Sequence, residues 1–318
     1  MRWNLLIILT VLGFGAVSVY ASYARDLAAA RGRLLGRSST LGTSYGVLLE
    51  YSVVGTGEPV VIIHGAAGGF DQALDMTEPL AASGFQLIAP SRFGYLGSSL
   101  PARPTVEMQA DAYVELLDHL GIAKVDVVSI SAGAWSTLQL AIRHPERVRA
   151  LVLLVPADYL PPGMSIHGGA IVRSFFNSDF IAWAQLKLMP ILPGGMFRMI
   201  LGTDHGVVDG ASPAEKARVQ QILERLLPVS SRVGGMNFDV ATAADREPYA
   251  LEKITCPVLA VSSDDDRFGT ALRAKYIASH VKQGKTVIYP TGGHALVGHY
   301  TGTLNVGAAF LHTLVERE

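Results

Sequence analysis

The chain has 318 residues, of which 49% are hydrophobic and 17% are charged, and its 26 Lys and Arg residues nearly balance its 27 Asp and Glu residues. This composition excludes a disordered chain and a protein that wraps nucleic acid with a basic surface, so we expect no nucleic-acid partner. Because Cys256 is the only cysteine, disulfide frameworks and cysteine-rich zinc sites are excluded as well. The chain is long enough to fold around a large core without such supports.

The N-terminal segment carries no charged residue from Trp3 to Ala24. As a helix this stretch would extend about 33 Å, enough to cross the hydrocarbon layer of a bilayer. A cleaved secretory signal is the alternative, with a cleavage site near Ala21. We therefore expect residues 1–24 to form a single membrane helix or a signal segment. Positive charges that follow the apolar run favour an uncleaved anchor with the globular part on the cytoplasmic side; they are Arg25, Arg31, Arg33 and Arg37.

A polar linker is expected over residues 25–44, and one α/β domain over residues 45–318. Short apolar runs alternate there with helical patterns, which indicates a mostly parallel sheet with helices on both faces. The predicted strands are Val47–Val53, Pro59–Ile63, Gln86–Ala89, Lys124–Ile130, Ala150–Val155, Val258–Ser262 and Thr286–Tyr289. The predicted helices are Asp71–Ala82, Val106–Leu120, Ala132–Arg143, Thr270–Val281 and Gly302–Val315.

The alternation stops between about residues 160 and 245, where the sequence is helical and rich in Phe, Met and Leu. An insertion between two parallel strands would lie over their carboxyl ends, where ligands bind. We expect a helical lid whose aromatic side chains contact the substrate: Phe175, Phe176, Phe180 and Trp183. The alternative is a helical subdomain whose aromatic residues pack only on one another.

Ser131 is the candidate nucleophile. It follows the predicted strand Lys124–Ile130 within Ser129-Ile130-Ser131-Ala132-Gly133, and a helical pattern begins at once. Small residues at this bend permit the sharp turn that lifts a serine hydroxyl above the sheet. The same turn places the backbone N–H of Ala132 at a helix N-terminus, where it can stabilise an oxyanion.

A second loop, His64-Gly65-Ala66-Ala67-Gly68-Gly69, follows the predicted strand Pro59–Ile63. Glycines let the backbone of such a loop turn an N–H toward a ligand, and Ala66 would supply the second oxyanion donor. The loop lacks the spacing of a dinucleotide or phosphate-binding loop.

Two further polar segments follow predicted strands: Asp264-Asp265-Asp266 after Val258–Ser262, and Gly292-Gly293-His294 after Thr286–Tyr289. The chain order Ser, Asp, His is the order found when all three side chains rise from one edge of a parallel sheet. His294 would accept the serine proton and return it to the leaving group, while an aspartate holds its imidazole in the correct tautomer. His299 competes for this role, but it is expected near the start of the last helix.

Together these segments resemble the α/β-hydrolase superfamily from Tyr45 to the C-terminus. The segment Ser91–Ser98 also resembles a loop of that family, although Ser91, Phe93 and Leu96 depart from its usual sequence. The resemblance implies an α/β-hydrolase fold with a helical lid. It also implies that the triad acid is Asp266, because Ser263 stands where relatives commonly have the glycine of Gly-x-x-Asp. Asp265 is the second choice, and Asp158, which follows Ala150–Val155, is the third because some relatives place their acid there.

The predicted function is therefore that of a serine hydrolase cleaving a small to medium apolar ester. A serine nucleophile excludes the dehalogenases and epoxide hydrolases of the superfamily, which need an aspartate. Hydrolysis of a C–C bond in a ring-cleavage product and perhydrolysis are alternatives, and a small-molecule binder on the same fold is a second one. No cofactor or metal is expected, since the acyl chemistry needs neither. The expected partners are a small carbonyl substrate and, through the N-terminal helix, a membrane.

Overall fold

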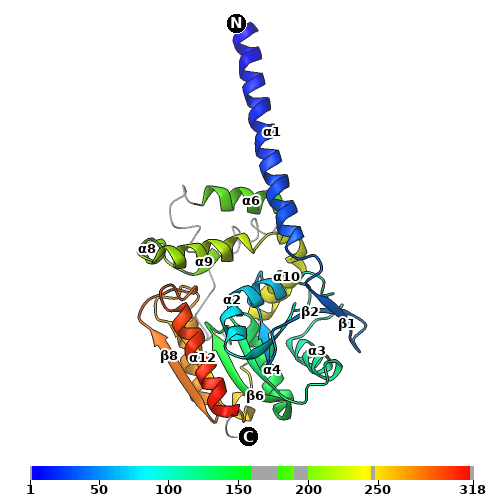
Figure 1. Ribbon diagram of the computed structural model, residues 1–318, viewed down its shortest axis with the longest axis vertical. Helices are drawn as coiled ribbons and strands as arrows, with labels where there is room; N and C mark the ends of the chain where they lie inside the picture. The colour runs from blue at the N-terminus through cyan, green and yellow to red at the C-terminus, as the bar shows by residue number, and fades with distance from the viewer. Residues whose placement is uncertain (1, 159–177, 190–199, 245–247, 316–318) are drawn as a thin grey trace.

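The computed structural model describes residues 2–158, 178–189, 200–244 and 248–315. An eight-stranded sheet runs through the body of the protein in the order β1-β2-β4-β3-β5-β6-β7-β8 (Figure 1). Strand β2 is antiparallel to both of its neighbours, and the remaining pairs are parallel. The strands are β1 (Ser39–Gly42), β2 (Leu48–Val54), β3 (Glu58–Ile63), β4 (Phe85–Pro90), β5 (Val125–Ile130), β6 (Val148–Leu154), β7 (Val258–Ser263) and β8 (Gly284–Tyr289). The predicted α/β-hydrolase sheet is confirmed.

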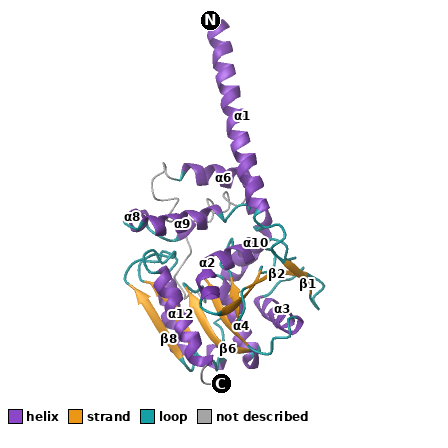
Figure 2. Cartoon of the chain, in the orientation of Figure 1, coloured by secondary structure: helices purple, strands orange, loops and turns teal. Residues whose placement is uncertain are grey.

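Helices cover both faces of the sheet (Figure 2). The main ones are α2 (Phe70–Ala82), α3 (Val106–His119), α4 (Gly133–Arg143), α11 (Thr270–His280) and α12 (Tyr300–Val315), whereas the long helix α1 (Arg2–Gly32) lies outside these two layers. Between β6 and β7 lie α6 (Asp179–Leu188), α8 (His205–Asp209), α9 (Pro213–Glu224) and α10 (Val233–Ala244), within the helical insertion that the sequence predicts. Short 3-10 turns lie at Pro145–Arg147, Val229–Ser231 and Leu251–Lys253.

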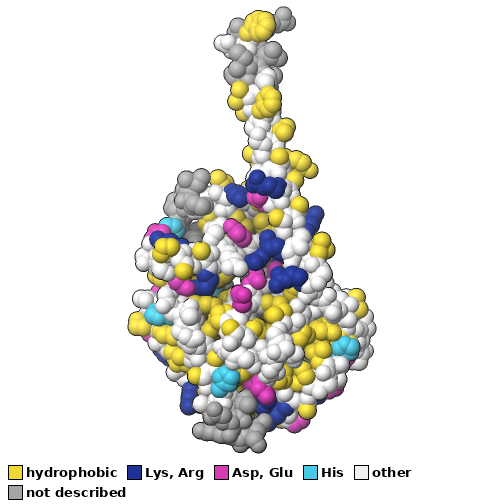
Figure 3. All heavy atoms as spheres, in the orientation of Figure 1, with side chains coloured by type: hydrophobic (Ala, Val, Ile, Leu, Met, Phe, Trp, Pro, Cys, Tyr) yellow, Lys and Arg dark blue, Asp and Glu magenta, His cyan; other side chains and the backbone are white. Residues whose placement is uncertain are grey.

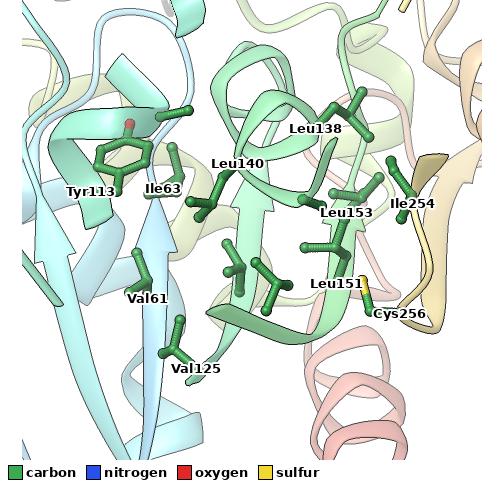
Figure 4. Packing of buried hydrophobic residues seen from close by; sticks show 14 of the residues in the cluster. Val61, Ile63, Tyr113, Val125, Leu138, Leu140, Leu151, Leu153, Ile254 and Cys256 are labelled. Carbon is green, nitrogen blue, oxygen red and sulfur yellow. The ribbon is translucent and has the colours of Figure 1, made fainter. Parts of the chain in front are cut away.

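Alternating residues of each central strand build two cores. Val61 and Ile63 of β3 face the side covered by α3, α4 and α11, where Tyr113 and Leu140 pack against them (Figure 4). Val60 and Ile62 face the opposite side, which α2 and α12 cover. Strands that are buried on both faces read as continuous apolar runs, which is why the sequence predicts them well.

The expected linker over residues 25–44 is not a linker. Helix α1 continues to Gly32, and Ser39–Gly42 forms the edge strand β1, which pairs with β2 so that Ser39 lies opposite Tyr51. The strand is short and its side chains are mostly exposed, so no apolar run marks it in the sequence. Its backbone hydrogen bonds to β2 stabilise it instead.

Helix α1 projects from the body, and apolar side chains along it are exposed (Figures 1 and 3). Its last turns carry Arg25, Asp26 and Arg31 and pack against the insertion, where Arg31 pairs with Asp179 at 3.6 Å. Among the described residues, no helix combines the length and the apolar character that crossing a membrane requires. The prediction of a membrane-spanning helix, and of the localisation that depended on it, is therefore wrong, and no described helix supports the predicted membrane partner.

Candidate active site

The loops that follow β3, β5, β7 and β8 meet at one edge of the sheet, because these strands are parallel and their carboxyl ends point the same way. The register places Ile63 of β3 opposite Ser129 of β5. The loop after Ile63 therefore lies beside the turn that holds Ser131.

Ser131 lies at a strained turn between β5 and α4. Its φ of 50° is in the left-handed region, which costs a non-glycine residue about 1–2 kcal/mol. Two backbone hydrogen bonds of Ser131 stabilise the turn: its N–H donates to the Leu154 carbonyl at 2.9 Å, and its carbonyl accepts from the Ala157 N–H at 3.0 Å. A Cβ at Gly133 would lie 2.6 Å from the carbonyl oxygen of Ile63, so only glycine fits there. This turn presents the serine hydroxyl above the sheet.

Ser131, His294 and Asp266 form a continuous hydrogen-bonded chain. The Oγ of Ser131 lies 3.0 Å from Nε2 of His294, and Nδ1 of the same ring lies 2.8 Å from Oδ2 of Asp266. Phe268 packs edge-on against the imidazole with ring centroids 4.8 Å apart. The competing His299 instead stacks on Tyr289, with centroids 4.1 Å apart and an angle of 7° between the rings.

The three consecutive aspartates point to three different partners. Asp264 forms an exposed ion pair with Lys275 at 3.0 Å. Asp265 accepts the backbone N–H groups of Gly292 and Gly293 at 3.2 and 2.8 Å, and so fixes the loop that carries the histidine. Asp266 alone of the three contacts the imidazole. The alternative acid Asp158 is buried and lines the same cavity, but the described contacts join the imidazole to Asp266.

Asp266 is held ionised by its surroundings. Burial raises the pKa of its carboxyl, but the charge and hydrogen bond of His294 and hydrogen bonds from Thr270 Oγ1 and the Phe268 N–H outweigh that effect, so the pKa lies below its ordinary value. Thr270 is itself hydrogen-bonded to Ser262 at 2.7 Å. The carboxylate is therefore fixed in place and ready to orient the imidazole.

The candidate oxyanion donors Ala66 and Ala132 both line the cavity beside Ser131. In the described part of the chain, neither backbone N–H donates a hydrogen bond to another protein group, whereas the neighbouring Ala67 N–H donates to Tyr95 Oη at 3.3 Å. Two unpaired donors beside a serine hydroxyl are what an oxyanion hole requires.

A buried network fixes the loop that carries Ala66. Asp239 of α10 accepts two hydrogen bonds from Arg92 at 2.7 Å each and one from Tyr95 Oη at 2.5 Å. Arg92 also donates to the Gly65 carbonyl at 3.1 Å, and its N–H donates to Nε2 of His64 at 2.8 Å. Burial and the charge of Arg92 hold the pKa of His64 well below its ordinary value, so the ring is neutral and its Nδ1–H donates to the Gly65 carbonyl.

Sequence reasoning missed this network. Arg92 lies in the segment Ser91–Ser98, whose resemblance to a family loop was the only available signal. No sequence signal pointed to Asp239, since it lies 147 residues from Arg92 in a helical stretch without a recognisable motif.

The cavity beside Ser131 encloses about 280 Å³. Its walls are largely apolar and include Met76 of α2, together with Leu201, Leu226 and Met236 from the insertion. A second set of lining side chains is charged: Asp158 and Arg273. Within the described ranges, no group of three or more His, Cys, Asp and Glu side chains could hold a metal ion.

The predicted substrate contacts of the insertion's aromatic residues are not found where they can be checked. Phe180 and Trp183 of α6 pack against Tyr23 of α1, with ring centroids 5.2 and 5.7 Å apart, and Trp183 Nε1 donates to Asp26 at 3.0 Å. Neither lines the cavity in the part of the chain that is described. The sequence could not show that α1 folds back onto α6 and covers its aromatic face. Phe175 and Phe176 lie outside the described residues.

Comparison with known proteins agrees with this fold. Residues 58–298 match the alpha/beta hydrolase fold family. An uncharacterized hydrolase of Bacillus subtilis, YcgS, is 28% identical over 261 residues, which cover 79% of this chain and 89% of that protein. A 2-hydroxy-6-oxo-6-(2'-aminophenyl)hexa-2,4-dienoic acid hydrolase of Metapseudomonas resinovorans is 26% identical over 84% of this chain and 88% of its own length. The solved alpha/beta hydrolase fold protein of Nakamurella multipartita has a TM-score of 0.67 and 26% identity over 86% of this chain and 98% of that one. The chain is therefore a hydrolase that belongs to the alpha/beta hydrolase fold family.

Proposed function

We propose that the chain is a serine hydrolase that cleaves a carboxylic ester through an acyl-enzyme, with Ser131 as nucleophile, His294 as general base and acid, and Asp266 as the group that orients the imidazole. The observation that carries this proposal is the chain of hydrogen bonds at 3.0 and 2.8 Å that joins these side chains beside the cavity. A serine hydroxyl alone is a poor nucleophile and needs the adjacent base.

The reaction would begin when Ser131 Oγ attacks the ester carbonyl carbon and its proton passes to Nε2 of His294. The carbonyl oxygen, which becomes negatively charged, would accept hydrogen bonds from the N–H groups of Ala66 and Ala132. When the tetrahedral intermediate collapses, the C–O bond of the ester breaks and the alcohol leaves with the proton from Nε2. Water then attacks the acyl-enzyme, gives a proton to Nε2, and the acid is released as Ser131 regains its hydrogen.

The helical insertion would act as a lid over this site. It supplies apolar side chains to the cavity, among them Leu201, Leu226 and Met236. These residues, rather than Phe180 and Trp183, would contact the apolar part of the substrate. The cavity volume of about 280 Å³ lies just below the usual range for ligand pockets, which suits a small acyl group better than a long one.

Hydrolysis of a C–C bond next to a carbonyl is the second candidate. Two relatives named as hydrolases of 2-hydroxy-6-oxo acids favour it, at 26% identity over 84% and 69% of this chain. The same three side chains would serve both reactions, so the two candidates must be distinguished by their substrates. The assay compares the turnover of a 2-hydroxy-6-oxo dienoate, followed by its absorbance, with the turnover of p-nitrophenyl esters.

The test compares Ser131→Ala with Ser129→Ala. The wild-type protein should hydrolyse p-nitrophenyl esters and be labelled by a fluorophosphonate at Ser131, located by peptide mass spectrometry. Ser131→Ala should lose about 10⁴-fold or more in kcat and lose the label. Ser129 is a matched control two residues away, because its hydroxyl is buried with no hydrogen-bond partner among the described residues and its replacement should leave activity intact.

The proposal would be contradicted if wild-type protein neither takes the label nor hydrolyses any ester or dienoate. A binding function on the same fold would then be the remaining explanation. Full activity in Ser131→Ala would also contradict it.

A further inference from the structure

Arg273 is a buried cation that the proposed acyl chemistry does not use. It lies in the first turn of α11 and is 5% exposed, and it lines the cavity beside Ser131. Its Nε has no hydrogen-bond partner, and among the described residues its guanidinium makes no hydrogen bond or ion pair. The other buried arginines around the site are paired: Arg92 with Asp239, and Arg232 with Asp71.

An arginine in this state is costly to the folded protein. Burying a guanidinium whose N–H donors make no hydrogen bond is unfavourable, and arginine does not avoid the cost by losing its proton. Burial lowers the pKa of Arg273, although the charges of Asp158 and Asp266 raise it. Asp266 is already hydrogen-bonded to His294 and Thr270. Side chains that are this costly persist where they serve a function.

The position of Arg273 favours an anion as its missing hydrogen-bond acceptor. The N-terminal end of α11 lies at the cavity, where Thr270 is also a lining residue, so the helix dipole adds positive potential beside the guanidinium. Arginine binds carboxylates through two parallel hydrogen bonds, a geometry that neutral acceptors do not match as well. The rest of the wall is mainly apolar and would hold the carbon chain between the two ends of a substrate.

We propose that Arg273 binds a carboxylate carried by the substrate, so that this enzyme prefers esters whose acyl part bears a second, ionised carboxyl group. The inference rests on the proposed ester hydrolysis and specifies its substrate class. An entering carboxylate pairs with the guanidinium and places the ester carbonyl at Ser131. The apolar part of the acyl chain spans the cavity.

The first test measures kcat/KM for p-nitrophenyl hydrogen glutarate and for its methyl ester, which has the same chain without the charge. Wild-type protein should prefer the acid at least tenfold, and Arg273→Met should reduce that ratio at least tenfold. Arg273→Lys should lie between the two, because it keeps the charge without the planar fork. Lys275→Met is the matched control, since it removes one positive charge from the exposed face of the same helix and should leave the ratio unchanged.

The second test reads binding without turnover. Glutarate should raise the melting temperature of wild-type protein and of Ser131→Ala, but not that of Arg273→Met, with sodium chloride at equal ionic strength as the control.

Two results would overturn the assignment: an unchanged ratio in Arg273→Met, or no stabilisation of wild-type protein by glutarate. The two proposals fail separately. If no ester is hydrolysed, ester hydrolysis is wrong, yet glutarate binding to Ser131→Ala still tests Arg273. If neutral esters are hydrolysed and glutarate does not bind, only the role of Arg273 is wrong.

Discussion

Replacing Asp239 should both destabilise the protein and weaken catalysis, although this residue lies in α10 and outside the proposed triad. Its carboxylate accepts three hydrogen bonds, two from Arg92 and one from Tyr95, and all three side chains are buried. Burial alone would lower the pKa of Arg92, but the charge of Asp239 raises it above its ordinary value, which shows how strongly the cation depends on its partner.

The magnitude follows from the charge that is left behind. Removing one partner of a buried ion pair typically costs about 3–5 kcal/mol, against a total stability of about 5–15 kcal/mol for a natural protein. Asp239→Ala should therefore lower the free energy of unfolding by about that amount. Arg92→Met combined with Asp239→Ala should recover part of the loss, because no unpaired charge remains.

The catalytic effect follows from the position of the oxyanion loop. Gly65 accepts a hydrogen bond from Arg92, Ala67 donates one to Tyr95, and the proposed oxyanion donor Ala66 lies between them. Loss of one oxyanion donor costs about 10²–10³-fold in kcat, so a donor that is displaced but present should cost less than that. We expect kcat to fall about 10–100-fold with a smaller change in KM.

Urea unfolding and steady-state hydrolysis of a p-nitrophenyl ester measure the two effects on the same variants. Asp75 offers a control carboxylate, because it pairs with Arg225 nearer the surface and makes no contact with the oxyanion loop among its described contacts. The reasoning is refuted if Asp239→Ala costs less than about 1 kcal/mol, or if it destabilises no more than the double variant does.

Asp266→Asn should abolish most ester hydrolysis, whereas Asp265→Asn should cause a smaller loss through the loop that holds His294; a larger loss at Asp265 would contradict the assignment. Because the folded-state pKa of Asp266 is below its ordinary 3.8, its ionised form should stabilise the protein above about pH 4 and lose that contribution as pH falls further, so the difference in melting temperature between wild type and Asp266→Asn should shrink toward pH 3. Burial raises the pKa of the Cys256 thiol to about 12, so a thiol reagent should label it only in denaturant, and rapid labelling of native protein would refute this. Deleting residues 1–32 should expose the aromatic face of α6 and lower the melting temperature, whereas deleting residues 1–18 should not, since the described contacts with α6 begin beyond them.

The sequence alone determined the sheet and the position of three loops on it. Strands such as Val125–Ile130 are buried on both faces and therefore appear as continuous apolar runs, and the polar residues that follow them must meet at the carboxyl edge of a parallel sheet. That local reasoning was sufficient to predict that Ser131 and His294 lie together, because it depends only on where each strand ends.

The tertiary structure determined which way side chains point and which residues distant in the sequence they contact. Asp264, Asp265 and Asp266 are identical in chemistry and adjacent in sequence, and only the fold sends one to Lys275, one to backbone N–H groups and one to His294. The same holds for the aromatic side chains of α6, which α1 covers, and for Arg273, which a helical pattern leaves indistinguishable from an exposed arginine until packing buries it beside the cavity. Whether a side chain is buried or paired depends on contacts between segments far apart in the chain, so neither property can be predicted from a short stretch of sequence.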